Sequence, residues 1–77
     1  MKSVMEKEIE RFQAIADEGS TYTVVAIQEL IESRAMNRPV QWLKGLKRLE
    51  LDDGSPVNYI DPNTFKIVHT EQIIRRI

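Results

Sequence analysis

The sequence predicts a mainly β domain, a small antiparallel meander that forms an SH3-like barrel or half-barrel. Two observations predict this fold. Asp17-Glu18-Gly19 and Asp52-Asp53-Gly54 are hairpin signals, because aspartate suits a type I turn and glycine supplies the left-handed position that closes it. Short apolar runs with residues alternating in polarity flank both signals. An α+β domain with one short helix is the alternative.

Residues 1–8 are expected to be a frayed or helical lead-in. Apolar residues follow one another at helix-like spacings of four, three and four at Met5, Ile9, Phe12 and Ala16. Because the first hairpin signal overlaps the end of this stripe, we expect a strand to begin near Ile9.

A three-residue loop fixes the register of the first hairpin. It sets Phe12 opposite Val24 and Ala14 opposite Tyr22, which gathers the apolar residues on one side. A three-residue loop at residues 52–54, the second signal, fixes the register of the second hairpin in the same way.

In the second hairpin the predicted pairs are Leu49 with Val57 and Lys47 with Tyr59. Leu49, Val57 and Tyr59 then share the inward face. The polar residues sent to the other face are Arg48, Glu50 and Asn58.

The remaining segments are expected to be mostly extended. Residues 26–36 are compatible with strand or helix, and we favour a strand that ends near Ile31. Residues 33–41 contain Asn37 and Pro39 and predict a loop. A turn at residues 61–64, a strand with alternating Phe65 and Ile67, and a last short strand in IIRRI complete the chain.

Length and composition indicate one small globular domain. A chain of 77 residues has a small core, so a functional site is expected on its surface. The residues are 42% hydrophobic and 30% charged, with a net charge of -1 and no cysteine. No signal peptide or membrane-spanning run is readable, and we expect a cytoplasmic protein.

Charge is uneven along the chain. Residues 1–33 carry three cations and seven acids, and the remainder carries eight cations and five acids. A compact meander is expected to interleave the two parts into a mixed surface.

The arrangement of these motifs resembles a family of short uncharacterised bacterial proteins. The matching positions are Phe12, residues 17–19, 22–24, 45–48 and 53–54, Val57, Asn58, Asp61, Thr64, Phe65, Ile67 and residues 74–76. The resemblance covers most of the chain, except for residues 36–42. It implies a single β-rich domain. The family has no established activity, so the resemblance implies no ligand, partner or site residue.

Residue types that could support catalysis or bind metal occupy positions with structural roles. His69 is the only histidine, and it continues the Phe65 and Ile67 alternation as a strand-end residue would. Ser20 and Ser55 follow turn glycines. The carboxylates Glu50, Asp52, Asp53 and Asp61 lack EF-hand spacing. We expect no enzyme activity, no cofactor and no metal.

Binding is therefore the expected class of function. One type of partner is a protein, a peptide or a second copy, met through a strand edge or an apolar patch near Pro39 and Trp42. The alternative is single-stranded nucleic acid, which the net charge of -1 disfavours. Trp42 has a structural alternative as a cap on the open end of the barrel. The candidate binding residues are Arg38, Trp42, Lys44, Lys47, Arg48, Asn58 and Tyr59.

Overall fold

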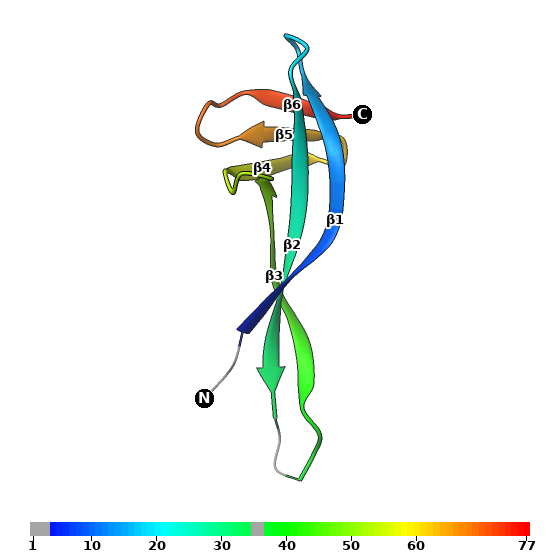
Figure 1. Ribbon diagram of the computed structural model, residues 1–77. Helices are drawn as coiled ribbons and strands as arrows, with labels where there is room; N and C mark the ends of the chain where they lie inside the picture. The colour runs from blue at the N-terminus through cyan, green and yellow to red at the C-terminus, as the bar shows by residue number, and fades with distance from the viewer. Residues whose placement is uncertain (1–3, 35–36) are drawn as a thin grey trace.

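The structure is a computed structural model, and it describes residues 4–34 and 37–77. These residues form six antiparallel strands joined by turns (Figure 1). The strands are β1 (Val4–Ala16), β2 (Thr21–Ser33), β3 (Gln41–Leu51), β4 (Pro56–Asp61), β5 (Thr64–Ile67) and β6 (Ile73–Arg76). Each strand pairs with the next, and β6 pairs with β1, which closes the barrel. The predicted meander and barrel are confirmed. The α+β alternative is wrong, since the described residues contain no helix.

The N-terminal lead-in is the first correction. β1 begins at Val4, so residues 4–8 are extended rather than helical or frayed, while residues 1–3 lie outside the described part. Intervening glutamates and lysines favour a helix in isolation, but pairing with β2 from Val4 onward supplies the backbone hydrogen bonds and overrides that preference.

Both predicted bulged hairpins are confirmed. Gly19 and Gly54 have φ values of 100° and 90°, in the left-handed region that glycine adopts without a steric penalty. In the first hairpin the carbonyl of Ala16 accepts a hydrogen bond from the Gly19 amide at 2.9 Å, and the same contact joins Gly54 to Leu51. The predicted pairs Phe12 with Val24, Ala14 with Tyr22, and Leu49 with Val57 are all present.

The other segments differ only in their bounds. β2 runs to Ser33, two residues beyond the predicted end near Ile31. The helical reading of residues 26–33 is therefore wrong, and residues 35–36 lie outside the described part. The turn at residues 61–64 is confirmed, with the Asp61 carboxylate accepting a hydrogen bond from the Asn63 amide at 2.9 Å. The last strand is β6, as predicted.

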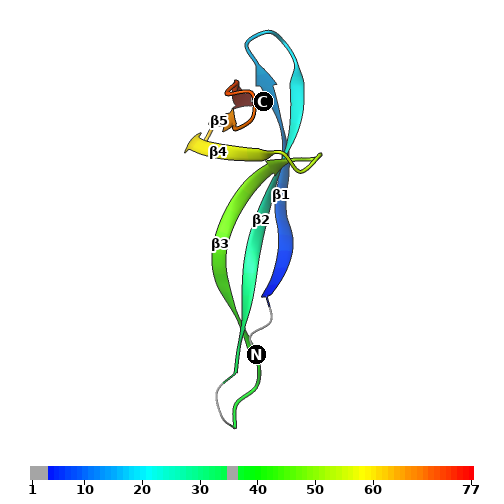
Figure 2. The ribbon, with the colours of Figure 1, turned by 90° about the vertical axis from the view of Figure 1, so that its left-hand side faces the viewer.

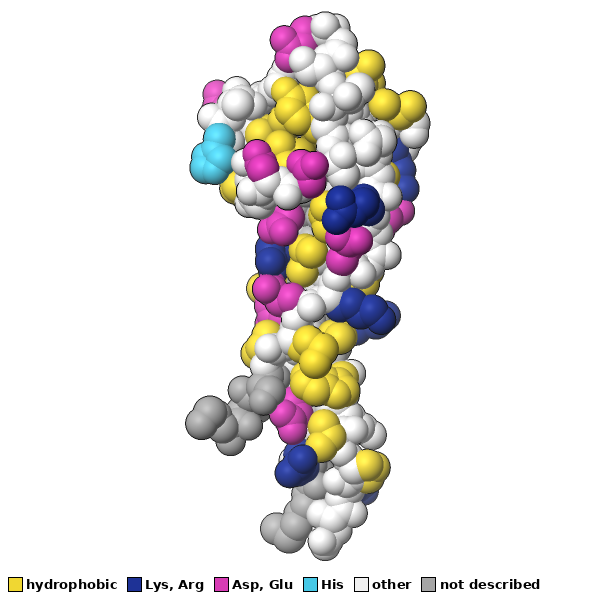
Figure 3. Space-filling model, viewed as in Figure 1, with side chains coloured by type: hydrophobic (Ala, Val, Ile, Leu, Met, Phe, Trp, Pro, Cys, Tyr) yellow, Lys and Arg dark blue, Asp and Glu magenta, His cyan; other side chains and the backbone are white. Residues whose placement is uncertain are grey.

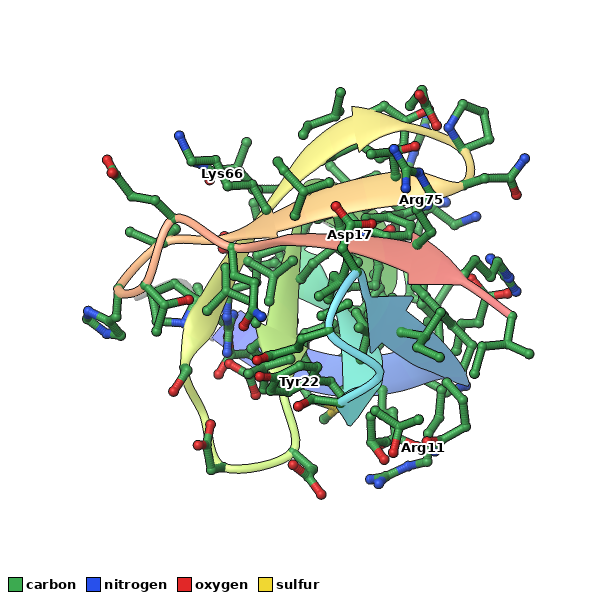
Figure 4. The ribbon with its side chains drawn as sticks, turned by 90° about the horizontal axis from the view of Figure 1, so that it is seen from above. Arg11, Asp17, Tyr22, Lys66 and Arg75 are labelled. Atoms are coloured by element: carbon green, nitrogen blue, oxygen red, sulfur yellow. The ribbon has the colours of Figure 1, made fainter. Side chains whose placement is uncertain are left out.

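The hydrophobic core lies inside the barrel. Its buried members are Ala14, Ala16, Val24, Leu51, Val57, Phe65, Ile67 and Ile74, with Phe12, Tyr22 and Leu49 packed against them. Polar contacts join the turns at one end of the barrel. The Tyr22 hydroxyl donates a hydrogen bond to the Gln72 side chain at 2.9 Å, and Arg75 lies 3.1 Å from Asp17, beside it in Figure 4.

Strands β1, β2 and β3 continue far beyond the barrel as a twisted ribbon (Figures 1 and 2). We call this ribbon the arm; it consists of residues 4–8, 27–33 and 41–48. The molecule extends 56 × 21 × 19 Å and has a radius of gyration of 15.8 Å. A compact chain of this length has a radius of gyration of about 11–12 Å. The arm is therefore a projection and not part of the globular core.

Candidate functional site

A β-bulge in β3 determines which side chains of the arm share a face. Gln28 of β2 pairs with Lys47, but Leu30 pairs with Lys44, so Gly45 and Leu46 together oppose one β2 residue. Side chains alternate along a regular strand, and without the bulge Lys47 and Lys44 would point to opposite sides. The extra residue brings them to the same side.

Gln28 holds this bulge in place. The residue is only 7% exposed, and its Nε2 donates hydrogen bonds to the carbonyl oxygens of Glu29 at 3.0 Å and Gly45 at 3.1 Å. Carbonyls displaced from the β-ladder by a bulge need other donors when they are shielded from water. The glycine within a strand pattern is the one sequence signal for this irregularity.

The face of the arm that continues the barrel interior is basic. Following the register outward from buried Val24, this side carries Met5, Lys7, Leu30, Trp42, Lys44 and Lys47, which we call the basic face. The acid that shares this side of the arm, Glu32, lies 3.8 Å from Arg34.

The opposite face is acidic. It carries Val4, Glu6, Glu8, Glu29, Ile31 and Leu43, which we call the acidic face. The cations beside it are already paired, Arg11 with Glu8 at 2.7 Å and Arg48 with Glu6. The mixed surface expected from the sequence is therefore wrong for the arm, where the register separates the two signs of charge.

Apolar side chains are exposed on both faces of the arm. Val4 and Leu43 on the acidic face are 58% and 51% exposed, and Met5 and Trp42 on the basic face are also exposed. Figure 3 shows such side chains along the arm below the barrel. The total exposed area is 5740 Å². A compact protein of 9.0 kDa exposes about 4900 Å², so the excess is roughly 850 Å².

A pocket opens where the arm meets the barrel. The β3–β4 ladder ends at Leu49 and Val57, so the predicted pair of Lys47 with Tyr59 does not form. Both residues instead line a cavity of about 590 Å³, which we call the mouth pocket. Its apolar lining includes Ile9, Phe12, Ala26, Leu49, Val57 and Phe65, and its polar lining consists of Glu10, Lys47, Arg48, Asn58, Tyr59 and Arg76.

Tyr59 shares the face of Val57 and Phe65, as predicted, but it is not buried in the core. The side chain is 63% exposed, and its ring meets the Phe65 ring edge-on with centroids 6.1 Å apart. The cause is the early end of the β3–β4 ladder, because β4 diverges from β3 after Val57 and carries Tyr59 to the pocket rim.

The candidate binding residues fall into three places. Lys47, Arg48, Asn58 and Tyr59 line the mouth pocket. Trp42 and Lys44 lie on the basic face together with Lys47. Arg38 is exposed in the loop between β2 and β3 and does not line the pocket. Trp42 pairs with Glu32 in the outer part of the arm, so its prediction as a cap of the barrel is wrong.

Sequence reasoning missed two charged residues of the pocket. The Arg76 guanidinium lies 4.1 Å from the centroid of the Phe12 ring, within cation–π range, and 2.6 Å from the Glu10 carboxylate. Glu10 and Arg76 are 66 positions apart. Closure of the barrel by β1 and β6 brings them together, and no local pattern predicts that contact.

The carboxyl groups with shifted pKa values, Asp53 and Asp61, hold turns. Hydrogen bonds from the backbone amides of Ser55 and Asn63 lower the pKa values of Asp53 and Asp61, respectively. His69 is exposed in the turn after β5, so the prediction that it continues the strand is wrong, because β5 ends at Ile67. Residues 4–34 and 37–77 hold no cluster of three or more histidine or acidic side chains suited to a metal ion, and no helix able to cross a membrane.

No family model, curated protein or solved structure matches the chain. The resemblance to a family of short bacterial proteins therefore stays a prediction. Function has to be inferred from the arm and the mouth pocket.

Proposed function

We propose that this chain is a non-catalytic interaction module that binds a protein partner through its arm. The observation that carries the proposal is the exposure of apolar side chains on both faces of a three-stranded ribbon. Such a ribbon needs a covered apolar face to be stable by itself, and nothing among the described residues covers either face of this one. The excess exposed area of roughly 850 Å² matches the roughly 800 Å² that one partner buries in a standard interface.

A protein partner can cover the exposed apolar side chains on both faces, whereas a nucleic acid can cover only those on the basic face. Single-stranded nucleic acid would stack on Trp42 and neutralise Lys44 and Lys47 on the basic face. It would leave Val4 and Leu43 exposed beside glutamates that repel phosphates. Nucleic acid is therefore the second candidate, supported by the basic face alone.

The partner is expected to cover the faces of the arm rather than extend its sheet. Both outer strands have open edges, but β1 carries a register shift between Glu8 and Glu10, and β3 carries its bulge at Gly45 and Leu46. Bulges and charged residues on edge strands hinder pairing with a further strand.

Charge favours a different acidic protein over a second copy. A two-fold symmetric contact through the basic face would bring two rows of lysines together, namely Lys7, Lys44 and Lys47 from each copy. A basic face against an acidic face has complementary charge, but this head-to-tail contact does not close with two copies. We therefore expect a partner that covers both faces and places an acidic segment with apolar anchors on the basic face.

Photo-crosslinking in cells tests the proposal. A photoreactive amino acid replaces Trp42 or Leu43, one on each face of the arm, and a control places it at Val68, which is exposed outside the arm. The expected result is a protein adduct from both arm positions and not from Val68. The peptide joined at position 42 should be acidic, and Lys44→Glu should abolish that adduct.

Other outcomes contradict the proposal. Nuclease-sensitive adducts would favour nucleic acid, and salt-sensitive quenching of Trp42 fluorescence by single-stranded oligonucleotides would support that reading. Adducts of twice the chain mass, with a sedimentation mass that grows with concentration, would establish self-association instead.

A further inference from the structure

We infer that the mouth pocket binds a small amphipathic carboxylate, a molecule with an apolar body and one anionic head. The pocket shares Lys47 with the basic face, but the inference does not depend on the proposed partner, because the pocket also uses side chains of β4, β5 and β6 that the arm lacks.

The pocket has the size and lining of a small-molecule site. Its volume of about 590 Å³ falls within the roughly 300–1,000 Å³ typical of such sites. Buried Val57 and Phe65 and half-buried Phe12 and Leu49 form its apolar floor. These residues also belong to the core or pack against it, so the floor is rigid and does not need a ligand to form.

Tyr59 gives the pocket an amphipathic edge. It is held against Phe65 by the edge-on ring contact, and most of its surface faces outward at the rim. An aromatic ring positioned at the rim of an apolar floor can cover the body of a ligand, while its hydroxyl stays in water.

The charges of the rim select for one anionic group. Two of the three cations are engaged: Arg76 by Glu10, and Arg48 by Glu6 and by Glu50 at 3.5 Å. Lys47 forms no ion pair within residues 4–34 and 37–77. One uncommitted ammonium group next to an apolar floor matches one carboxylate, and the Asn58 side chain offers an amide donor at the same rim.

A titration with decanoate and with uncharged decanol tests the inference. We expect decanoate to bind in a one-to-one ratio and to shift the backbone amide resonances of Lys47, Asn58 and Tyr59 in two-dimensional NMR spectra. Decanol should bind about five- to ten-fold more weakly, because it fills the apolar floor without meeting the ammonium group.

Two variants distinguish decanoate binding in the pocket from general binding to the basic face. Lys47→Gln should weaken decanoate binding about five- to ten-fold and leave decanol binding unchanged. Lys44→Gln is the matched control, since it removes a lysine from the same strand and face but does not line the pocket. It should leave decanoate binding unchanged, although Lys44 is central to the proposed partner surface. Both side chains are exposed, so both variants should unfold at the same temperature as the parent.

Four results would overturn the inference. Equal affinity for decanoate and decanol would remove the role of the ammonium group. Equal effects of Lys47→Gln and Lys44→Gln would show general attraction to the basic face. Amide shifts confined to arm residues that do not line the pocket, or the absence of binding, would show that the pocket is not the site.

Discussion

The side-chain amide of Gln28 donates a hydrogen bond to the carbonyl oxygen of Gly45 at 3.1 Å, from the central strand of the arm to the bulge on its edge strand. This contact stabilises the one-residue shift that places Trp42, Lys44 and Lys47 on one face. The basic face therefore depends on a buried glutamine that carries no charge.

Replacing Gln28 with leucine should destabilise the protein by about 1–3 kcal/mol. Leucine is similar in size but has no donor for the shielded carbonyls of Glu29 and Gly45. The measurement is urea unfolding followed by circular dichroism. Gln41→Leu, at an exposed position of β3, is the control. If Gln28→Leu is as stable as the parent, water donates hydrogen bonds to these carbonyl oxygens as effectively as the glutamine amide does.

Gly54→Ala and Gly45→Ala should lower the free energy of unfolding by different amounts, because the two glycines are needed for different reasons. Gly54 has a φ of 90° and open space where a Cβ atom would lie, so Gly54→Ala should cost about 1–2 kcal/mol through backbone strain alone. A Cβ atom on Gly45 would lie 3.0 Å from the Ile31 Cδ1 atom, the end of a flexible side chain that can shift.

Gly45→Ala should therefore cost less than about 1 kcal/mol, since alanine also restricts the unfolded chain more than glycine does. Thermal unfolding of the two variants ranks them. A larger loss for Gly45→Ala than for Gly54→Ala would show that close packing at the bulge, and not turn geometry, limits the stability of the fold.

The hairpins are predictable from the sequence because their determinants are local. Gly19 and Gly54 each follow two acidic residues, and the parity of a three-residue loop then pairs Phe12 with Val24 and Leu49 with Val57. Six strands and a closed barrel follow from such turns when the apolar residues are gathered on one side.

The candidate site is less predictable because it depends on irregular and distant features. Counting by twos along β3 separates Lys44 from Lys47, and only the bulge at Gly45 reunites them. The prediction that Tyr59 belongs to the core assumes that the β3–β4 ladder continues past Val57, where the ladder in fact ends. The length of unpaired strand edge cannot be read from side-chain alternation, which is the same for paired and open strands.

Acid should destabilise the two turns that Asp53 and Asp61 hold, over a pH range that their pKa values determine. Hydrogen bonds from the amides of Ser55 at 2.8 Å and Asn63 at 2.9 Å lower the pKa values of Asp53 and Asp61 below the ordinary value of 3.8. A carboxylate whose pKa is lower in the folded state stabilises the fold above its unfolded pKa. That contribution is lost as the pH falls through the lowered folded value.

The double variant Asp53→Asn with Asp61→Asn should therefore lose less stability than the parent between about pH 5 and about pH 2. Asparagine keeps an acceptor oxygen for each turn but does not titrate there. Urea midpoints across this range give the comparison, and Asp52→Asn in the same loop is the control. An acid dependence as steep in the double variant as in the parent would assign the loss to other carboxylates.

Shortening the arm should leave a folded barrel. The eight buried core residues all lie outside residues 29–46. An Asn-Gly turn in place of residues 29–46 can join the remaining parts of β2 and β3, because this dipeptide favours the two-residue hairpin turn. Gln28 is changed to threonine in this variant, since the carbonyls that it serves are removed.

The shortened chain should unfold cooperatively, and its radius of gyration in X-ray scattering should fall from 15.8 Å to about 11 Å. It should also retain decanoate binding, because every residue that lines the pocket lies outside the deleted segment. Lys47 and Arg48 directly follow the new turn. A shortened chain without a cooperative transition would place part of the folding energy in the arm, and the separation of a stable barrel from a partner-binding arm would then be wrong.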